Sequence, residues 1–144
     1  MTDIYLVGLD GSAEGLRAAD FAADRALQSG AQLVLAYVIE WSPYSFHSAE
    51  ELATRHQRRD AEIERARTEV LGPIRDRMTA RGLVVSAEVR HGHPAKTIAE
   101  LASETRANQM FIGRKGSTGL GSMLFGSVAA TLVQIAPVPV TVVP

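Results

Sequence analysis

The sequence contains no cysteine among its 144 residues, which excludes disulfide bridges, thiolate catalysis and thiolate metal ligands. It has no strong charge, because 15 basic and 16 acidic side chains give a net charge of −1 and no global attraction for nucleic acids or acidic membranes. No apolar run reaches the roughly 20 residues that cross a bilayer, and the first residues lack the pattern of a secretory signal. We therefore expect a cytoplasmic protein without membrane insertion or a nucleic-acid partner.

Two common phosphate-binding motifs are also missing. There is no G-x-x-x-x-G-K-[ST] sequence, and the first apolar run continues as GLDGSAEG rather than G-x-G-x-x-G. A P-loop and a dinucleotide site are therefore not predicted. The spacing of acidic residues, serines and histidines gives no catalytic triad, carboxylate pair or dedicated metal site, so no catalytic or metal-ligating residue is predicted.

What the sequence does contain is a regular alternation of short apolar runs with longer helical patterns. The runs typical of buried strands lie at 4–9, 32–39, 83–89, 109–113 and 138–143, and the helical patterns lie at 12–30, 48–81, 92–105 and 124–135. Parallel strands joined by right-handed helical crossovers are the economical arrangement of such elements. The sequence therefore predicts a single domain over residues 1–144 with a three-layer α/β fold, an open parallel five-stranded sheet with helices on both faces.

Individual residues mark the expected ends of the helices. Ser12 is expected to cap the first helix and Gly30 to end it. Pro73 removes a backbone donor and should kink or break the long helix near Gly72. Ser48 with Glu51 forms a capping box at the start of that helix. The residues at helical spacing on the expected inner side of the first helix are Leu16, Ala19, Ala23 and either Ala26 or Leu27.

A His-Gly-His sequence precedes Pro94 and could suggest a metal pair or a nucleotidyl-transfer signature. His91 and His93 are two residues apart in an expected loop, with no acidic partner nearby in the sequence. We therefore expect a surface turn. The aromatic residues Trp41 and Phe46, together with Tyr44, follow the second strand and leave two alternatives open, either lining a ligand pocket or covering the ends of helices.

The most informative segment is GRKGSTGLGSMLFGSVA, residues 113–129, which holds five of the twelve glycines. Glycines let successive backbone N–H groups turn toward an anion, and the start of the following helix adds free N–H groups and a positive dipole. With Arg114 and Lys115 nearby, the segment suits two or three phosphates, as in a nucleotide. The alternative is a flexible Gly/Ser loop without a ligand.

The spacing of Gly113, Gly116, Gly126 and Ser127 is G-x2-G-x9-G-[ST], which resembles the nucleotide-binding signature of the universal stress protein family. Further matches in the same order are VGLDGS, YVIE, GHPAKTIAELA and PVPVTVV. The resemblance covers essentially the whole chain apart from residues 41–81. It implies a Rossmann-like sheet of strand order 3-2-1-4-5 that holds ATP, with Mg²⁺ coordinated largely by phosphate oxygens.

The resemblance also assigns roles by position. Leu9 and Asp10 would lie beside the adenine and ribose, and Val38 would contact the adenine. Arg114 and Lys115 occupy the two spacer positions of the signature, where they either contact phosphate or are solvated. The ribose and phosphates would be held by Gly113, Gly116, Gly126, Ser127 and the N–H of Val128.

As a function, the resemblance implies an ATP-binding stress-response or regulatory protein that senses or stores nucleotide and signals to an unknown protein partner. The last strand would be an apolar edge strand, and such edges invite pairing. We therefore expect a homodimer through Val138, Val140, Thr141 and Val142. The alternatives are a slow ATPase or nucleotidyl-transferring enzyme on the same fold, and an interaction module that no longer binds nucleotide.

Overall fold

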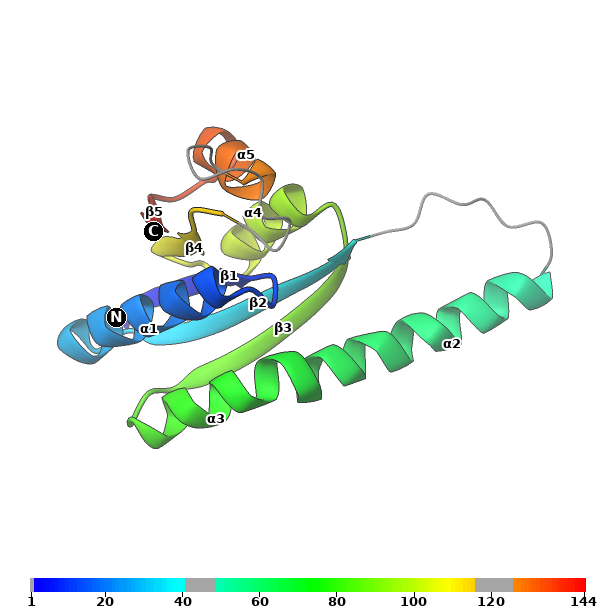
Figure 1. Cartoon of the computed structure of the whole chain (residues 1–144), viewed down its shortest axis with the longest axis horizontal. Coiled ribbons are helices and arrows are strands. Elements are labelled where there is room, and N and C mark those ends of the chain that lie inside the picture. The colour runs from blue at the N-terminus through cyan, green and yellow to red at the C-terminus, as the bar shows by residue number, and fades with distance from the viewer. Residues whose placement is uncertain (1, 41–48, 116–125) are drawn as a thin grey trace.

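The computed structural model describes residues 2–40, 49–115 and 126–144. Over these ranges the chain forms a single parallel sheet in the order β3-β2-β1-β4-β5 (Figure 1). Its strands are β1 (Ile4–Leu9), β2 (Gln32–Glu40), β3 (Val85–Gly92), β4 (Gln109–Gly113) and β5 (Val140–Val143). The predicted fold class and strand order are confirmed, and β5 is an edge strand. Ser48, Gly116 and the aromatics Trp41, Tyr44 and Phe46 lie outside the described residues.

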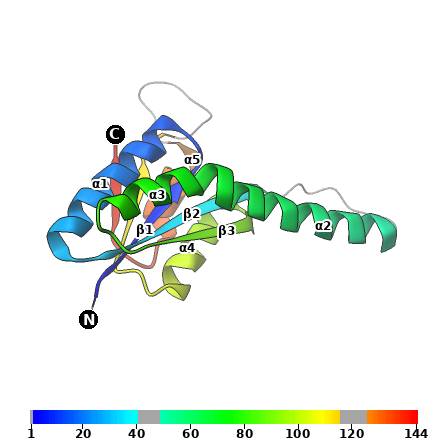
Figure 2. The same ribbon diagram turned by 90° about the horizontal axis from the view of Figure 1, so that it is seen from below.

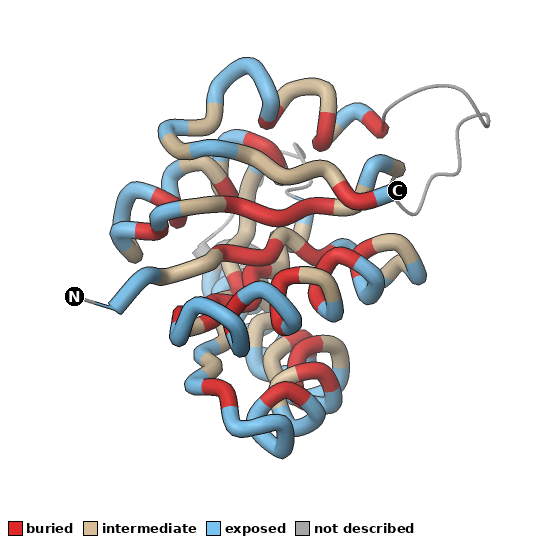
Figure 3. The backbone as a smooth tube through the Cα atoms, turned by 90° about the vertical axis from the view of Figure 1, so that its left-hand side faces the viewer, coloured by how far each residue is buried: buried red, intermediate tan, exposed pale blue. Residues whose placement is uncertain are grey.

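Helices cover both faces of this sheet (Figure 2). They are α1 (Ala13–Ser29), α2 (Ala49–Arg65), η1 (Ala66–Leu71), α3 (Gly72–Ala80), α4 (Pro94–Glu104) and α5 (Ser127–Ile135). One buried cluster joins α1, η1 and α3 to one face, and a second joins α4 and α5 to the other. The buried stretches follow the middle of the strands and the inner sides of the helices (Figure 3). No described helix has the length and apolar character needed to span a membrane.

Helix α1 packs on the sheet through small residues. Ser12 accepts a hydrogen bond from the N–H of Gly15, and Gly30 ends the helix with a φ of 78°, as predicted. The prediction that Leu16 faces the core is wrong, since its exposed fraction is 36%; of the alternatives Ala26 and Leu27, Ala26 is buried and Leu27 is 45% exposed. A row of alanines forms the buried face instead, which lets the helix axis approach the strands closely. The row consists of Ala18, Ala19, Ala22, Ala23 and Ala26.

The long helical segment continues through Pro73 without a break, but the regular α-helix is interrupted just before Gly72, where η1 separates α2 from α3. The six residues of η1 are π-helical and end immediately before Gly72, which has ordinary helical φ and ψ angles of −55° and −52°. In a regular α-helix the proline ring would press against the carbonyl of Glu69. The wider π-helical turn places the irregularity before the proline, and α2 then extends past the carboxyl end of β3 (Figure 1).

Strand β3 begins and ends later than predicted. It spans Val85–Gly92 because β2 runs to Glu40 and supplies a pairing partner as far as Gly92. The predicted surface turn at His91 is therefore wrong. His91 is in the strand with only 12% of its side chain exposed, and its Nε2 lies 3.0 Å from a carboxylate oxygen of Glu62 on α2. The acidic partner comes from a distant part of the sequence.

Candidate functional site

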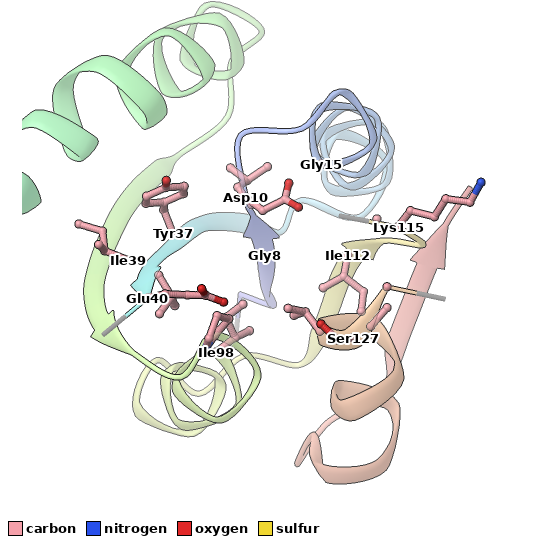
Figure 4. A pocket seen from close by; sticks show the side chains of 17 residues that line it. Gly8, Asp10, Gly15, Tyr37, Ile39, Glu40, Ile98, Ile112, Lys115 and Ser127 are labelled. Atoms are coloured by element: carbon pink, nitrogen blue, oxygen red, sulfur yellow. The ribbon is translucent and has the colours of Figure 1, made fainter. Parts of the chain in front are cut away.

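A cavity of about 340 Å³ opens at the carboxyl ends of the strands (Figure 4). It lies where β1, flanked by β2 on one side and β4 on the other, gives way to the first turns of the helices. This is the position at which strand order reverses, the usual ligand site of an open parallel sheet. The residues lining it come from β1, β2, β4, α1, α4 and α5 and from the residues between them.

Most of the positions named from the sequence meet at this cavity. The residues that line it are Leu9, Asp10, Val38, Gly113, Lys115, Gly126, Ser127 and Val128. Arg114 is exposed and does not line it. Gly116 lies outside the described residues. Their roles toward a ligand remain predictions, but segments more than 100 positions apart do converge on one hollow.

The floor of the cavity is apolar because Gly8 of β1 has no side chain, which leaves room for two isoleucines from neighbouring elements. A Cβ added at Gly8 would lie 3.1 Å from Cγ2 of Ile112 and 3.2 Å from Cδ1 of Ile98. Both isoleucine side chains therefore pack directly against the strand and, with Val38, form an apolar slot. A flat aromatic ring fits such a surface.

Asp10 has a structural role beside its place in the cavity wall. Its Oδ1 accepts a hydrogen bond from the N–H of Ser12 at 2.9 Å, and Gly11 between them has a φ of 84°. This is the turn that an Asp-Gly-Ser sequence favours. The turn aims the Asp10 carboxylate toward the cavity (Figure 4).

The start of α5 forms the opposite wall. Gly126 occupies the N-cap position and provides no side-chain hydrogen bond to the first turn. Its own N–H donates to the carbonyl of Arg114 at 2.9 Å, which fixes the helix start against the end of β4. Ser127 and Val128 follow directly and line the cavity. Backbone N–H groups and the positive end of the helix dipole thus lie at one end of the apolar slot.

Among the described residues that line the cavity, the acidic and basic side chains point in different directions. Asp10 and Glu40 direct their carboxylates into the cavity, whereas the Lys115 ammonium points away from it (Figure 4). The backbone N–H of Lys115 donates to Oε2 of Glu14 at 2.7 Å. The Lys115 ammonium is therefore at the rim of the cavity. The groups that could attract an anion inside it are the backbone N–H groups at the start of α5.

The sequence analysis missed several lining residues. Glu40 could have been found from strand alternation, because it shares a face of β2 with Val38. Gly8 and Ile112 carry no local signal, since their role depends on packing between β1, β4 and α4. The other missed lining residues are Gly15, Tyr37, Ile39, Pro94, Ile98 and Ala129. Within residues 2–40, 49–115 and 126–144, no group of three His, Asp or Glu side chains is arranged to hold a metal ion.

The fold defines an α/β protein of the doubly wound class, with its cavity at the topological switch point. The sequence model of the universal stress protein family matches residues 1–144. A universal stress protein of Methanocaldococcus jannaschii is 30% identical over 141 residues, which cover 96% of this chain and 79% of that protein. The chain therefore belongs to the universal stress protein family, as its motifs indicated.

Solved structures give the same result for the fold. The universal stress protein UspA of Lactobacillus plantarum superposes with a TM-score of 0.82 at 22% identity, covering 99% of this chain and 97% of that one. A universal stress protein in complex with cAMP superposes with a TM-score of 0.71 at 26% identity, again over 99% and 97% of the two chains.

Proposed function

We propose that the protein is a cytoplasmic regulatory protein that binds an adenine nucleotide, ATP with Mg²⁺, in this cavity. The observation that carries the proposal is the combination of an apolar slot with a glycine-capped helix start at one end of it. A nucleotide has a flat base that suits the slot and phosphates that suit the N–H groups of α5. The relative bound to cAMP, at 26% identity, supports the adenine nucleotide class.

In this arrangement the base lies against Val38, Ile98 and Ile112, and the Asp10 carboxylate accepts hydrogen bonds from the ribose or base. The phosphates approach Ser127 and the N–H of Val128. Since the described wall directs carboxylates rather than cations inward, a triphosphate needs a counterion. A divalent cation carried by the phosphate oxygens supplies it.

The test is calorimetric titration of the purified protein with ATP, ADP, AMP and adenosine, each with and without Mg²⁺. We expect saturable binding of the nucleotides and a requirement for Mg²⁺ that grows with the number of phosphates. Absence of binding by all three nucleotides at millimolar concentration would overturn the proposal. Chromatography of ATP after incubation separates the enzymatic alternative, because turnover far above background would favour a slow ATPase.

We also propose that the protein forms a homodimer through β5. Strand β5 is at the edge of the sheet, and its Val140, Thr141 and Val142 are half-buried within one chain. Nearby on α5, Val133 and Ile135 are 52% and 46% exposed. An apolar edge of this kind is stabilised by pairing with a second copy.

The dimer can be tested by light scattering, which should give twice the chain mass at micromolar concentration. Val142→Lys should give the monomer, and a monomeric wild type contradicts the proposal. We also propose that this dimer signals nucleotide occupancy to a protein partner.

A further inference from the structure

Glu14 connects two parts of the chain that are about 100 residues apart. It lies in the first turn of α1, and its Oε2 accepts a hydrogen bond from the backbone N–H of Lys115 at 2.7 Å. Its other carboxylate oxygen lies 3.7 Å from the Arg17 guanidinium. The Glu14 side chain is 20% exposed and that of Arg17 is 54% exposed. The carboxylate is thus partly shielded and held at a defined place beside the cavity.

The contact depends on a close approach of backbones. A Cβ added at Gly113 would lie 3.1 Å from the carbonyl carbon of Glu14 and 3.1 Å from its Cβ. The first turn of α1 therefore rests directly on the carboxyl end of β4, which requires glycine at this point. This approach brings the Lys115 N–H within reach of the Glu14 side chain.

The Lys115 bond is one of three that fix the backbone of residues 114, 115 and 126. The N–H of Arg114 donates to the carbonyl of Val143 at 2.8 Å, and its carbonyl accepts from the N–H of Gly126 at 2.9 Å. These two bonds connect the backbone of Arg114 to β5 and to the start of α5. The Glu14 bond connects the next residue, Lys115, to α1.

We propose that Glu14 is a positioning residue for the phosphate end of the nucleotide site, an inference that rests on the proposed function. By holding the Lys115 N–H, its carboxylate keeps the backbone that follows β4 at a fixed distance from Ser127 at the start of α5. The negative charge of Glu14 also opposes the approach of phosphate, and the ion pair with Arg17 offsets part of this repulsion. The two effects have opposite signs, so substitutions can separate them.

Three variants make the separation. Glu14→Ala removes both the acceptor and the charge, Glu14→Asp keeps the charge but shortens the reach, and Glu14→Gln keeps an acceptor oxygen at the same reach without the charge. If positioning dominates, the Ala and Asp variants bind AMP and ATP about tenfold more weakly, because a hydrogen bond to a charged acceptor is lost. The Gln variant binds as tightly as wild type or more tightly. Arg17→Ala, which leaves the Lys115 bond in place, is the matched control and should change affinity by less than about threefold.

The readout is the difference between phosphorylated and unphosphorylated ligands. Calorimetry should show that the Ala and Asp variants keep the wild-type affinity for adenosine within about twofold, since the base slot is untouched. Hydrogen exchange in the ligand-free protein should show the Lys115 amide protected in wild type and Gln variants and unprotected in the Ala variant.

Different results overturn different claims. Equal or tighter nucleotide binding by the Ala variant would show that charge repulsion is the larger effect and would overturn the positioning role. An equal loss for adenosine and nucleotide, or a tenfold loss in the Gln variant, would also overturn it. If wild type binds no nucleotide at all, the proposed function fails, whereas the exchange experiment still decides whether Glu14 holds the Lys115 amide.

Discussion

Helices α1, α4 and α5 all begin at the edge of the sheet where the cavity lies, but their first turns differ. Ser12 Oγ accepts from the N–H of Gly15 in α1, and His93 Nδ1 accepts from the N–H of Lys96 in α4, at 3.1 Å and 3.3 Å. The cap residue of α5 is Gly126, which has no side chain to accept such a bond. All three helices have the same dipole direction. If the proposed function is correct, the phosphates bind at the helix start whose cap residue has no side-chain acceptor, and this contrast can be tested.

The conformation of Gly126 sharpens this point. Its φ and ψ angles of −62° and 155° lie in a region that every residue adopts. Gly11 and Gly30, by contrast, have φ angles of 84° and 78° that favour glycine. Backbone conformation therefore does not explain the glycine at position 126, whereas the proposed phosphate site would, because it needs open N–H groups there. The following substitutions test the contrast between the capped and uncapped helices.

The largest effect is expected from Gly126→Asp, which gives α5 a side-chain cap and places a carboxylate where phosphate is proposed to bind. We expect ATP affinity to fall more than about 100-fold, because like charges at close range cost several kcal/mol. The melting temperature should stay the same or rise, since aspartate is a favourable cap. Gly126→Asn is the control of similar shape without the charge and should lose less. If calorimetry shows that the Asp variant binds ATP at wild-type affinity, the phosphates do not bind at the start of α5.

A smaller effect is expected from Ser127→Ala, which removes the hydroxyl of a residue that lines the cavity. Nucleotide affinity should fall about tenfold through the loss of one hydrogen bond to a charged acceptor, while adenosine affinity and thermal stability remain unchanged. Ser127→Thr keeps the hydroxyl and should retain most of the affinity. A loss of stability without a loss of nucleotide binding would mean that Ser127 serves the helix rather than the ligand.

Ser12→Ala should have the reverse profile. Removal of this cap should lower the free energy of unfolding by about 1 kcal/mol, which urea denaturation can measure. Nucleotide affinity should change by less than about twofold, because the Ser12 hydroxyl is bonded to the first turn of α1 and Ser12 does not line the cavity. Ser12→Asn restores an acceptor and should restore stability. A tenfold change in ATP binding would contradict the distinction between the helices.

The smallest effect is expected at α4. His93→Ala should lower the free energy of unfolding by about 0.5 kcal/mol, since the 3.3 Å bond from Lys96 is long and exposed. His93→Asn should recover this difference in the same denaturation experiment. If the alanine variant instead gains nucleotide affinity, then an opened α4 competes with α5 as an anion site.

Elements whose signals are local could be predicted from the sequence. The span of β1, the Ser12 cap, the Gly30 stop and the strand order implied by the family motifs are all observed. The end of β3 could not be predicted, because it is set by the length of β2 beside it. Leu16 also carried no signal of its exposure, since it obeys helical spacing as well as the alanines do.

The candidate site divides in the same way. The glycine spacing predicted Gly113 and Gly126, and both line the cavity. Glu14 lies in the first turn of α1, and its partner Lys115 becomes visible only when α1 rests on β4. Gly8 likewise acquires its role from two isoleucines in other elements. The roles of these residues depend on contacts between distant segments, and a pattern within one segment does not contain that information.

The π-helical segment η1 has a consequence for how this chain can vary. A π-helical turn contains one residue more than the α-helical turn it replaces, and each residue of an α-helix accounts for about 100° of rotation. Deleting one residue between positions 66 and 71 would therefore restore a regular α-helix, because the wider turn completes nearly the same rotation with one residue more. Helices α2 and α3 would keep their faces, and Glu62 would stay opposite His91. The same deletion inside the regular part of α2 would instead turn the residues before it by about 100°, so η1 is the place where the chain can lose a residue without redirecting the projecting helix.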